Sequence, residues 1–433
     1  MCRRRVCSSA IYCAFLDAGN ADRLVGSSDA KSITFHKRIN DDMNKLKLPL
    51  FESPAKPGSP EAVIVFGGDF CPVNGYEKKI ISGEIIFDNA LAETFQSNDF
   101  AMINLEAPLC AKGLPTDSLN GSGLRGDPQV AEFIRNTGID AVGLANNHIR
   151  DFKDEGVSQT MQNLEKNGIL HTGAGKDLAD AQKPLSVDVN GIKVGIWALA
   201  EKELNVASDS SAGSSWFRPE HDVHRIAEIK EEFDFLVVYL HAGHEFISTP
   251  SPRIRASCRN LIEAGADAVI AHHPHVIQGV EKYKQGLIAY SLGNLVFDTP
   301  YVSAHKNTDL GYLLRIGISK HRIIEAEIIP YKLRGAVTVS TLNSSEFEAF
   351  TSKFHELSEN ITNDSKFWLE WDNNVRFRWE SEYKRILNDL SKNFNDPENK
   401  DYARRTKNLF TCPTHVEMLE KALSMIEKGK IPR

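Results

Sequence analysis

Three histidines crowd one short stretch of this 433-residue chain, at His272, His273 and His275. They follow the apolar run 268–271 directly, and the apolar pair Val276-Ile277 comes next. Neutral imidazole is the commonest metal ligand among side chains. Packing alone does not explain such a cluster at the expected end of a buried strand, so the motif predicts a metal site.

Four other apolar runs also end near polar residues that can bind a metal. The runs are 63–66, 100–103, 141–145 and 235–240, and the polar residues after them are Asp69, Glu106, Asn147-His148 and His241. Each ending by itself has a second interpretation: Gly-Asp often forms only a turn, Glu can cap a helix, and a lone His is often a satisfied core residue. Five endings with the same property favour a metal centre at the carboxyl ends of several strands.

The segment 145–151 contains residues suited to acid–base chemistry. Asn147 offers an amide oxygen as a ligand, and His148 beside it offers an imidazole as a proton donor. Asp151 could orient His148 by accepting its second ring proton. The alternative is an Asn-rich turn with an incidental histidine.

Two further motifs follow apolar runs. The segment 241–245 supplies two imidazoles and a carboxylate, from His241, His244 and Glu245, and its glycine lets the backbone approach a ligand closely. The segment 290–298, which includes Asn294, carries no obvious ligand set. It predicts either a pocket wall or a plain strand–turn–strand unit.

Composition excludes some classes of function. The formal net charge of −7 leaves no basic footprint, so nucleic acid is not an expected partner. The seven cysteines show no Cys-x-x-Cys spacing and are odd in number. This argues against a disulfide framework and favours a reducing compartment.

The N-terminal residues have two interpretations. Arg3-Arg4-Arg5 and the apolar stretch 6–16 are typical of a signal peptide, with a cleavage site at 19–21. Tyr12 interrupts that stretch and Asp17 ends it early. We therefore expect an uncleaved leader and a cytoplasmic location, and a secreted or periplasmic protein if residues 1–21 act as a signal peptide. No segment is long and apolar enough to span a bilayer.

Short apolar runs alternate with amphipathic stretches between residues 62 and 334. The runs named above, together with 194–199 and 287–290, predict strands, and Gly67-Gly68 is expected to stop the first of them. Stretches 158–167 and 253–264 predict helices that end at Gly168 and Gly265. This alternation is typical of a layered α/β architecture whose sheets are covered on both faces. Segments 312–318 and 323–331 predict a β-hairpin.

The proline- and glycine-rich segment before residue 62 and the change of composition after residue 344 predict three parts. These are a partly disordered leader and linker over 1–61, a domain over 62–334, and a helical C-terminal extension over 345–433 that packs on the core. Apolar residues recur in the extension at helical spacing, at Trp368, Trp371, Val375, Trp379, Tyr383, Ile386 and Leu390. Such a stripe could dock a partner, but we expect it to pack on the preceding domain.

Six motifs stand in one order along the chain: Gly68-Asp69, Asn104-Leu105-Glu106, Ala145-Asn146-Asn147-His148, His241-Ala242-Gly243-His244-Glu245, His273-Pro274-His275-Val276 and Ser291-Leu292-Gly293-Asn294. This series resembles the bacterial capsule-synthesis CapA family, which is associated with poly-γ-glutamate capsules and belongs to the calcineurin-like metallophosphoesterase superfamily. The resemblance covers about residues 62–331. It is specific for the family and not for a substrate.

The resemblance implies a four-layer α/β/β/α sandwich around a dinuclear metal centre. It implies that Asp69 and His275 bind the first metal and that Glu106 stands where the superfamily has a bridging Asp. Asn147, His241 and His273 would bind the second metal. His148 matches the histidine that protonates the leaving group, and Asp151 matches its orienting partner.

The chain departs from the superfamily pattern in the first metal site. Cys71 replaces a histidine ligand; a thiolate could bind zinc or iron, but a plain buried cysteine is the expectation. Glu245 could supply the missing ligand, and His244 and Asn104 are further candidates. Glu106, one methylene longer than Asp, could widen the distance between the metals. The expected cofactors are two divalent transition metals, either Mn, Fe or Zn.

These observations predict a metal-dependent hydrolase of the CapA type, a phosphoesterase acting in capsule, poly-γ-glutamate or exopolysaccharide biosynthesis. Its partners would be a phosphoester or polyglutamate substrate and the capsule-synthesis machinery. One alternative is a non-catalytic assembly subunit of a polymer synthesis or export complex. The other is an amide hydrolase or transferase that acts on γ-linked glutamate.

Overall fold

The computed structural model describes residues 44–48, 59–116, 123–203, 205–335, 337–393 and 400–431. The predicted leader, its alternative as a signal peptide, and most of the predicted linker lie outside these residues. The predicted limits of the three parts of the chain therefore stay predictions.

The larger of two main sheets has nine strands, in the order β1-β16-β15-β2-β3-β4-β5, with β14 beside β2 and β17 beside β16. Their bounds are β1 (Leu46–Lys47), β2 (Ala62–Cys71), β3 (Phe100–Leu105), β4 (Ala141–Gly143), β5 (Leu170–Thr172), β14 (Asn294–Phe297), β15 (Leu310–Ser319), β16 (Arg322–Arg334) and β17 (Thr338–Thr341). The strands from β2 to β5 are parallel, so their carboxyl ends meet at one edge. Strands β15 and β16 form the predicted hairpin.

The second sheet has six strands, in the order β12-β13-β11-β10-β8-β7. Their bounds are β7 (Leu185–Val189), β8 (Ile192–Ala200), β10 (Phe235–His241), β11 (Ala268–His272), β12 (Val280–Tyr283) and β13 (Gly286–Ala289). Strands β8, β10, β11 and β13 are parallel. Two short strands, β6 (Ala174–Gly175) and β9 (Gly213–Ser214), pair apart from both sheets.

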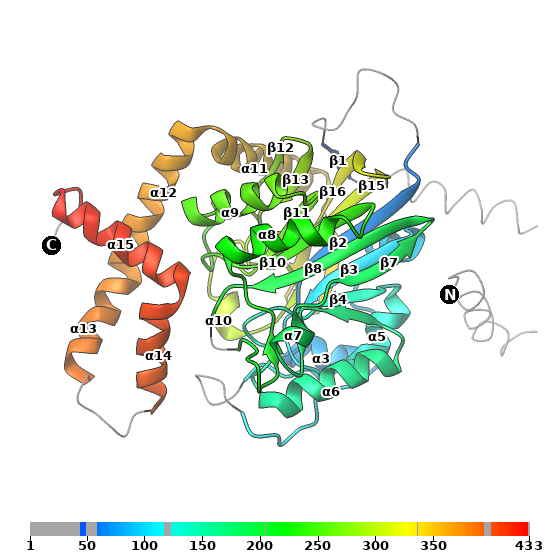
Figure 1. Cartoon of the computed structure of the whole chain (residues 1–433), viewed down its shortest axis with the longest axis horizontal. Helices are drawn as coiled ribbons and strands as arrows, with labels where there is room; N and C mark the ends of the chain where they lie inside the picture. Colours follow the sequence, from blue (N-terminus) through cyan, green and yellow to red (C-terminus); the bar gives the residue numbers. More distant parts are fainter. Residues whose placement is uncertain are drawn as a thin grey trace, which may run out of the picture. The chain divides into compact units, whose positions relative to one another are not determined.

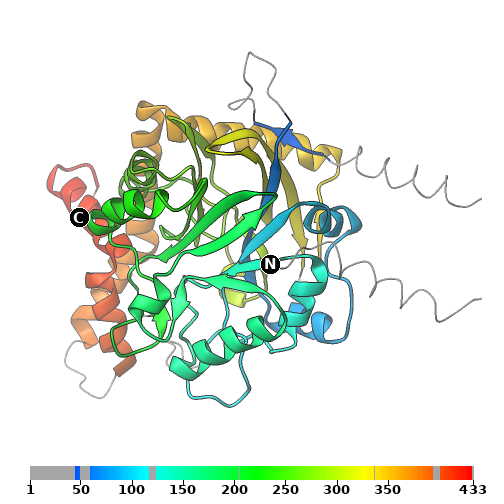
Figure 2. The same cartoon turned by 45° about the vertical axis from the view of Figure 1, so that its right-hand side comes forward.

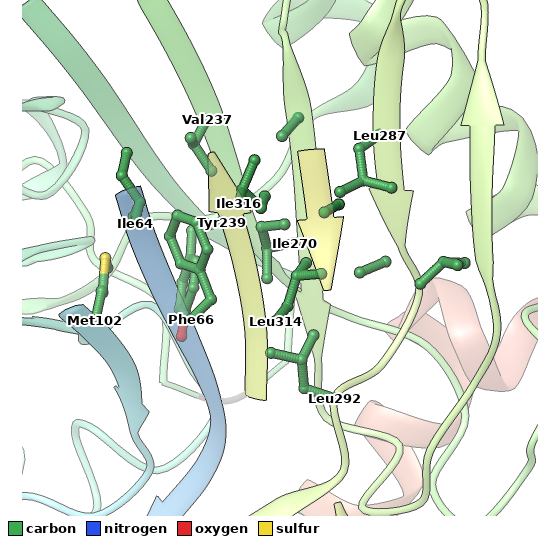
Figure 3. Close-up of a cluster of buried hydrophobic side chains, with 14 of the residues drawn as sticks. Ile64, Phe66, Met102, Val237, Tyr239, Ile270, Leu287, Leu292, Leu314 and Ile316 are labelled. Atoms are coloured by element: carbon green, nitrogen blue, oxygen red, sulfur yellow. The ribbon is translucent and has the colours of Figure 1, made fainter. Parts of the chain in front are cut away.

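The two sheets pack face to face around one apolar core. Figure 3 shows side chains of both sheets meeting there, among them Ile64, Phe66, Leu314 and Ile316 from the larger sheet and Val237, Tyr239, Ile270 and Leu287 from the smaller one. Alternate residues of a strand point to opposite faces. Accordingly Leu236 and Val238, which flank Val237 in β10, belong to a separate cluster on the outer face.

Helices cover the outer face of each sheet (Figure 1, Figure 2). The smaller sheet is covered by α8 (Pro219–Lys230) and α9 (Pro252–Glu263). The larger sheet is covered by α3 (Asn74–Ile81), α5 (Val130–Thr137) and α6 (Lys153–Lys166), and α4 (Asn89–Ser97) contacts β17 of the same sheet. Phe133 of α5, for example, stacks on Phe70 of β2 with ring centroids 6.4 Å apart. The predicted four-layer α/β/β/α architecture is confirmed.

The first strand does not stop at Gly67-Gly68, which corrects the sequence-based expectation. Strand β2 runs through both glycines to Cys71, with a shift of register against β3 between Phe66 and Asp69. A Cβ on Gly68 would lie 1.9 Å from the carbonyl oxygen of Gly293. The glycine is therefore needed for close approach of the 293–294 backbone, where the amide of Asp69 donates a 3.0 Å hydrogen bond to Gly293.

The predicted helices are confirmed, with small changes of their limits. Helix α6 begins five residues before the expected start at 158, and α9 begins at Pro252. The glycines that follow them, Gly168 and Gly265, have φ of +70° and +123°. These left-handed conformations explain why glycine ends each helix. Two one-turn helices, α7 (Leu178–Ala181) and α10 (Pro300–Ser303), lie in connecting segments.

The described part of the chain after β17 is mainly helical. Its elements are α11 (Ser344–Thr362), α12 (Asp364–Arg378), a π-helical turn η3 (Trp379–Tyr383), α13 (Lys384–Asn393), α14 (Lys400–Thr411) and α15 (Pro413–Glu427). A capping box of Asn343 and Glu346 starts α11, and Phe350, Phe354 and Leu357 of this helix join the core between the sheets. No helix among the described residues is long and apolar enough to cross a membrane.

The aromatic stripe of the extension packs mainly on other C-terminal helices rather than on the α/β layers. Trp371, Val375, Trp379 and Tyr383 form a cluster with apolar residues of α14 and α15, and Ile247 is its member from the preceding layers. Trp368 stays 46% exposed. The stripe pattern predicted the helix and its apolar face, but it carried no information on which apolar surface would cover that face.

Candidate metal centre

The carboxyl ends of the parallel strands bring the predicted ligands together. Asp69 lies near the end of β2, Glu106 directly after β3, and His241 at the end of β10. The backbone amide of His273, directly after β11, lies 3.3 Å from the Asp69 carboxylate. This contact joins the strand ends of the two sheets. The side chains involved are buried.

Two groups of donor atoms that could hold a metal ion share Glu106. One group is Glu106, His273 and His275, and the other is Asp69, Glu106 and His241; the donor atoms within each lie within 4.8 Å of one another. The Oε1 atom of Glu106 lies 3.7 Å from His241 Nε2 and 3.6 Å from His275 Nε2. Neither oxygen of this buried carboxylate has a hydrogen-bond partner among the described residues. Burial, with the charges of Asp69 and Glu245, raises the pKa of Glu106 well above its usual range.

Asp69 is the best-partnered carboxylate of the centre. Asn104 donates a 2.8 Å hydrogen bond to its Oδ1, and His272 Nδ1 lies 3.3 Å from the same oxygen. The Nδ1 atom of His275 lies 3.5 Å from Oδ2. Burial alone would raise the pKa of Asp69, but the surrounding histidines hold it well below its usual range. Asp69 is therefore ionised, as a ligand must be.

Asn147, His241 and His273 form a second convergent set. Asn147 Oδ1 lies 3.0 Å from His241 Nε2, and that nitrogen lies 3.1 Å from His273 Nδ1. Burial and the neighbouring histidines lower the pKa of His241 well below its usual value, so its ring is neutral. Within each of the two predicted ligand sets, side chains thus contact one another directly. The division of the ligands between two metals remains a prediction.

The backbone around the histidine cluster is strained. His273 and His275 have φ of +97° and +56°, a region that non-glycine residues seldom occupy. Such strain concentrates at functional sites, where the surrounding structure holds it. Asn294, which the sequence placed in no ligand set, orients one of these rings: its Oδ1 lies 3.0 Å from His275 Nδ1. The opposite ring nitrogen then faces Glu106.

His148 and Asp151 form the predicted pair, with 3.0 Å between His148 Nδ1 and Asp151 Oδ2. Asp151 is itself held by the backbone amide of Leu124 at 2.8 Å and by Asn205 Nδ2 at 2.9 Å. Burial lowers the pKa of His148, but Asp151 and nearby glutamates outweigh this effect and raise it. With Nδ1 paired to Asp151, Nε2 is the nitrogen that can serve as an acid.

The remaining candidates divide between the centre and its surroundings. Cys71 lies in an apolar cluster with Val73, Ala107, Phe297 and Val302 and belongs to neither donor group. Burial raises the pKa of its thiol. Asn104 contacts Asp69 and lies 3.2 Å from His241 Nδ1, where it can orient both.

His244 and Glu245 point in different directions. His244 packs against Trp371 of α12 in a tilted arrangement, with ring centroids 5.3 Å apart, and its Nε2 lies 3.8 Å from Glu417 of α15. Glu245 accepts a 2.7 Å hydrogen bond from Tyr301 at the wall of the cavity. Glu245 interacts electrostatically with His273 and His275.

A cavity of about 700 Å³ opens onto the centre. His148, Asp151, Glu245, His273 and His275 line it on the side of the α/β layers. The opposite wall comes from α12 to α14, with Arg378, Tyr383, Tyr402 and Arg405 among its residues. Neither this wall nor Glu203, whose Oε1 lies 3.8 Å from His273 Nε2, was identified from the sequence. No motif marks either, because both reach the site from loops or from distant helices.

The donor set fits a transition metal. Imidazole, carboxylate and amide ligands suit Mn²⁺, Fe and Zn²⁺. The carboxyl group of Glu106, buried between histidines with no hydrogen-bond partner among the described residues, is the observation that favours a cation here, because its ionised form is costly to bury without a compensating charge. The buried clusters can therefore hold metal ions.

Two relatives with assigned names are similar to this chain. It is 31% identical to "Capsule biosynthesis protein CapA" of Bacillus anthracis over 43% of this chain and 47% of that protein. It is 27% identical to "PGA biosynthesis protein CapA" of Bacillus subtilis over 65% of this chain and 73% of that protein. The matched region thus spans about half of the first relative.

Solved structures resemble the chain more weakly. A hypothetical protein from Thermus thermophilus aligns with a TM-score of 0.40 and 13% identity, over 62% of this chain and 99% of that one. A 5'-nucleotidase precursor from the same organism aligns with a TM-score of 0.36 and 13% identity, over 68% of this chain and 58% of that one.

The family described as bacterial capsule synthesis protein PGA_cap matches residues 63–299. This range includes both main sheets in large part, the two donor groups and the His148–Asp151 pair. It covers more than half of the chain, and it contains the ordered motifs on which the resemblance was based. The chain belongs to the bacterial capsule synthesis protein PGA_cap family.

Proposed function

We propose that this protein is a metal-dependent hydrolase, a phosphoesterase with a dinuclear centre, that acts in capsule or poly-γ-glutamate biosynthesis. The observation that carries the proposal is the pair of donor groups that share Glu106, one of which reaches the cavity lined by His148 through His273 and His275. Membership of the family and the names of the two Bacillus relatives support the biological process.

The proposed ligands are Asp69, Glu106, Asn147, His241, His273 and His275. Two divalent transition metals held by them would polarise a phosphoryl oxygen and lower the pKa of a bound water. In this arrangement Asn104 and Asn294 keep the ligands oriented through their hydrogen bonds to Asp69 and His275.

His148 is the proposed general acid. Its Nδ1 is paired with Asp151, so Nε2 would carry the proton that passes to the leaving oxygen of the substrate. Asp151 keeps the ring oriented and favours its protonated form, since its own two oxygens are fixed by Leu124 and Asn205. The raised pKa of His148 increases the protonated fraction near neutral pH.

The test combines elemental analysis with activity on one purified batch. Protein prepared without chelator should carry transition metal and hydrolyse members of a panel of phosphomonoesters and phosphodiesters. His273→Ala should lose most of one metal and the activity with it. His224→Ala, at an exposed position of α8, is the control and should keep both.

The same batch separates the alternatives. If the protein hydrolyses γ-glutamyl amides and no phosphoester, it is an amide hydrolase that uses the same metals, and the phosphoesterase proposal is wrong. Bound metal with no hydrolysis of either substrate class would favour a non-catalytic assembly subunit. Full retention of metal in His273→Ala would refute the ligand assignment.

A further inference from the structure

The C-terminal helices reach the candidate centre through one polar cluster, in which two residues are buried and two half-buried. Its members are Glu201 after β8, Arg253 at the start of α9, and Thr414 and Glu417 in the first turns of α15. Glu201 and Thr414 are 5% and 6% exposed. They lie 213 positions apart in the sequence, so the cluster is formed by the tertiary structure alone.

Arg253 holds the cluster together. Its backbone amide donates a 2.9 Å hydrogen bond to Glu417 Oε1, and its Nε lies 3.3 Å from Glu417 Oε2. Its Nη2 pairs with Glu201 and donates to Thr414 Oγ1 at 2.9 Å. One guanidinium therefore joins a carboxylate of α15 to a carboxylate at the end of β8.

The cluster also holds the segment 241–245, which carries His241 and Glu245. The amide of Glu201 donates a 2.8 Å hydrogen bond to the carbonyl of His241, and Glu201 Oε2 accepts one of 3.3 Å from the amide of Gly243. The hydroxyl of Thr414 contacts Glu201 Oε2 and lies 3.2 Å from the carbonyl oxygen of Gly243. Gly243 has φ of +116°, a conformation that favours glycine, so both peptide groups of this residue are free to meet the cluster.

We propose that Thr414 and Glu417 of α15 are positioning residues that fix the 241–245 segment through Glu201 and Arg253. The C-terminal helices are then part of the site, because the same contacts hold their cavity-lining residues opposite His273 and His275. The effect on metal binding rests on the proposed metal function, whereas the effect on the segment does not.

Hydrogen exchange tests the positioning directly on the metal-free full-length chain. Thr414→Val removes the hydroxyl at nearly constant volume, and Glu417→Gln removes the charge that faces Arg253. Each should accelerate exchange in peptides covering 241–246 by about tenfold or more, because hydrogen bonds to charged groups are lost. Thr414→Ser should restore slow exchange. Thr411→Val is the matched control, since the Thr411 hydroxyl is exposed and bonds to Lys407 of its own helix.

Competition with a chelator then measures the affinity for Zn²⁺. Loss of a residue that supports metal ligands typically weakens metal binding by about 10- to 100-fold. We expect a loss of this size for Thr414→Val and Glu417→Gln, and unchanged affinity for Thr411→Val. Glu417→Gln keeps the test decisive if Thr414→Val fails to fold.

Unchanged exchange in both variants would overturn the inference. Faster exchange with unchanged Zn²⁺ affinity would overturn its extension to the metal centre. A wild-type protein that binds none of Zn²⁺, Mn²⁺ and Fe²⁺ would refute the proposed metal function, and the exchange result alone would then decide whether α15 positions the segment.

Discussion

Glu106 is a buried carboxyl group of the site that lacks hydrogen-bond partners among the described residues. Its two oxygens have no hydrogen-bond partner, although three histidines and Asp69 surround it. Without a cation, burial and neighbouring carboxylates favour its protonated form. A residue that both donor groups share, and that the fold leaves unpaired, fits the bridging position that the family resemblance implies.

At the residue scale, His148→Ala tests the acid role. We expect kcat to fall by roughly 10²–10⁴-fold, the usual contribution of general acid catalysis, while metal content stays at the wild-type level. The loss should be smaller for substrates with good leaving groups such as nitrophenolate, because these need little protonation. Steady-state kinetics across a leaving-group series would measure this, and a uniform loss would contradict the assignment.

Cys71→Ser distinguishes packing from ligation. The thiol lies in an apolar cluster, so we expect unchanged metal stoichiometry and a loss of about 1–3 kcal/mol in the free energy of unfolding from burying a hydroxyl. Cys258→Ser is the matched control, because Cys258 is a buried residue of α9 and belongs to a different cluster. Loss of one metal in Cys71→Ser but not in Cys258→Ser would show that the thiolate is a ligand.

At the scale of elements, the contact between β2 and β14 sets the position of Asp69. Gly68 lies against the carbonyl of Gly293, and the next residue, Asp69, donates its amide hydrogen to the same oxygen. Asn294, one residue after Gly293, orients His275. One backbone contact therefore fixes a proposed ligand and the partner of another.

Gly68→Ala should break that contact. The added Cβ would meet backbone at 1.9 Å, which cannot move cheaply, so we expect a loss of more than about 3 kcal/mol in unfolding free energy together with loss of metal. Gly113→Ala is the control: Gly113 has φ of +84° and nothing within 4 Å of an added Cβ. That variant should lose about 1–2 kcal/mol from the left-handed backbone and keep its metal. Denaturant unfolding and elemental analysis check both.

At the scale of the whole molecule, stability should depend jointly on metal and pH. The raised pKa of Glu106 means that metal-free folded protein holds a proton that the unfolded chain releases. The contribution of Glu106 to the free energy of unfolding is thus complete at low pH. It is lost as pH rises from the ordinary pKa of a carboxyl group toward the raised pKa of Glu106. A cation reverses this loss because it binds the ionised form.

The stabilisation by Zn²⁺ should therefore grow from about pH 6 to about pH 8. At ~100 times its Kd, Zn²⁺ should add about 2.7 kcal/mol to the unfolding free energy, visible as a rise in Tm. Glu106→Gln should flatten the pH dependence, and Glu132→Gln, at an exposed position of α5, should retain it. A Zn²⁺-induced rise in Tm that is equal at both pH values, or larger at the lower one, would contradict the role of Glu106.

The sequence by itself determined the layered α/β class and most of the candidate centre. Apolar runs marked the buried strands, and the polar residues after them were expected at one edge of each sheet, because parallel strands present their carboxyl ends together. That the edges of the two sheets face one another was decided by the tertiary structure. Asp69, Glu106, His241 and His273 were identified in this way. The hairpin and the helix ends at Gly168 and Gly265 follow from equally local patterns.

Tertiary structure alone decided the features that depend on distant partners. Whether Gly67-Gly68 ends a strand or continues it depends on the Gly293 carbonyl, more than 200 residues away. The supports of the site, such as Asn205 for Asp151 and Thr414 for Glu201, are single polar residues with no periodic or spacing signal. An apolar stripe likewise shows that a helix face is buried but not which surface covers it, because burial depends on area and not on the identity of the partner.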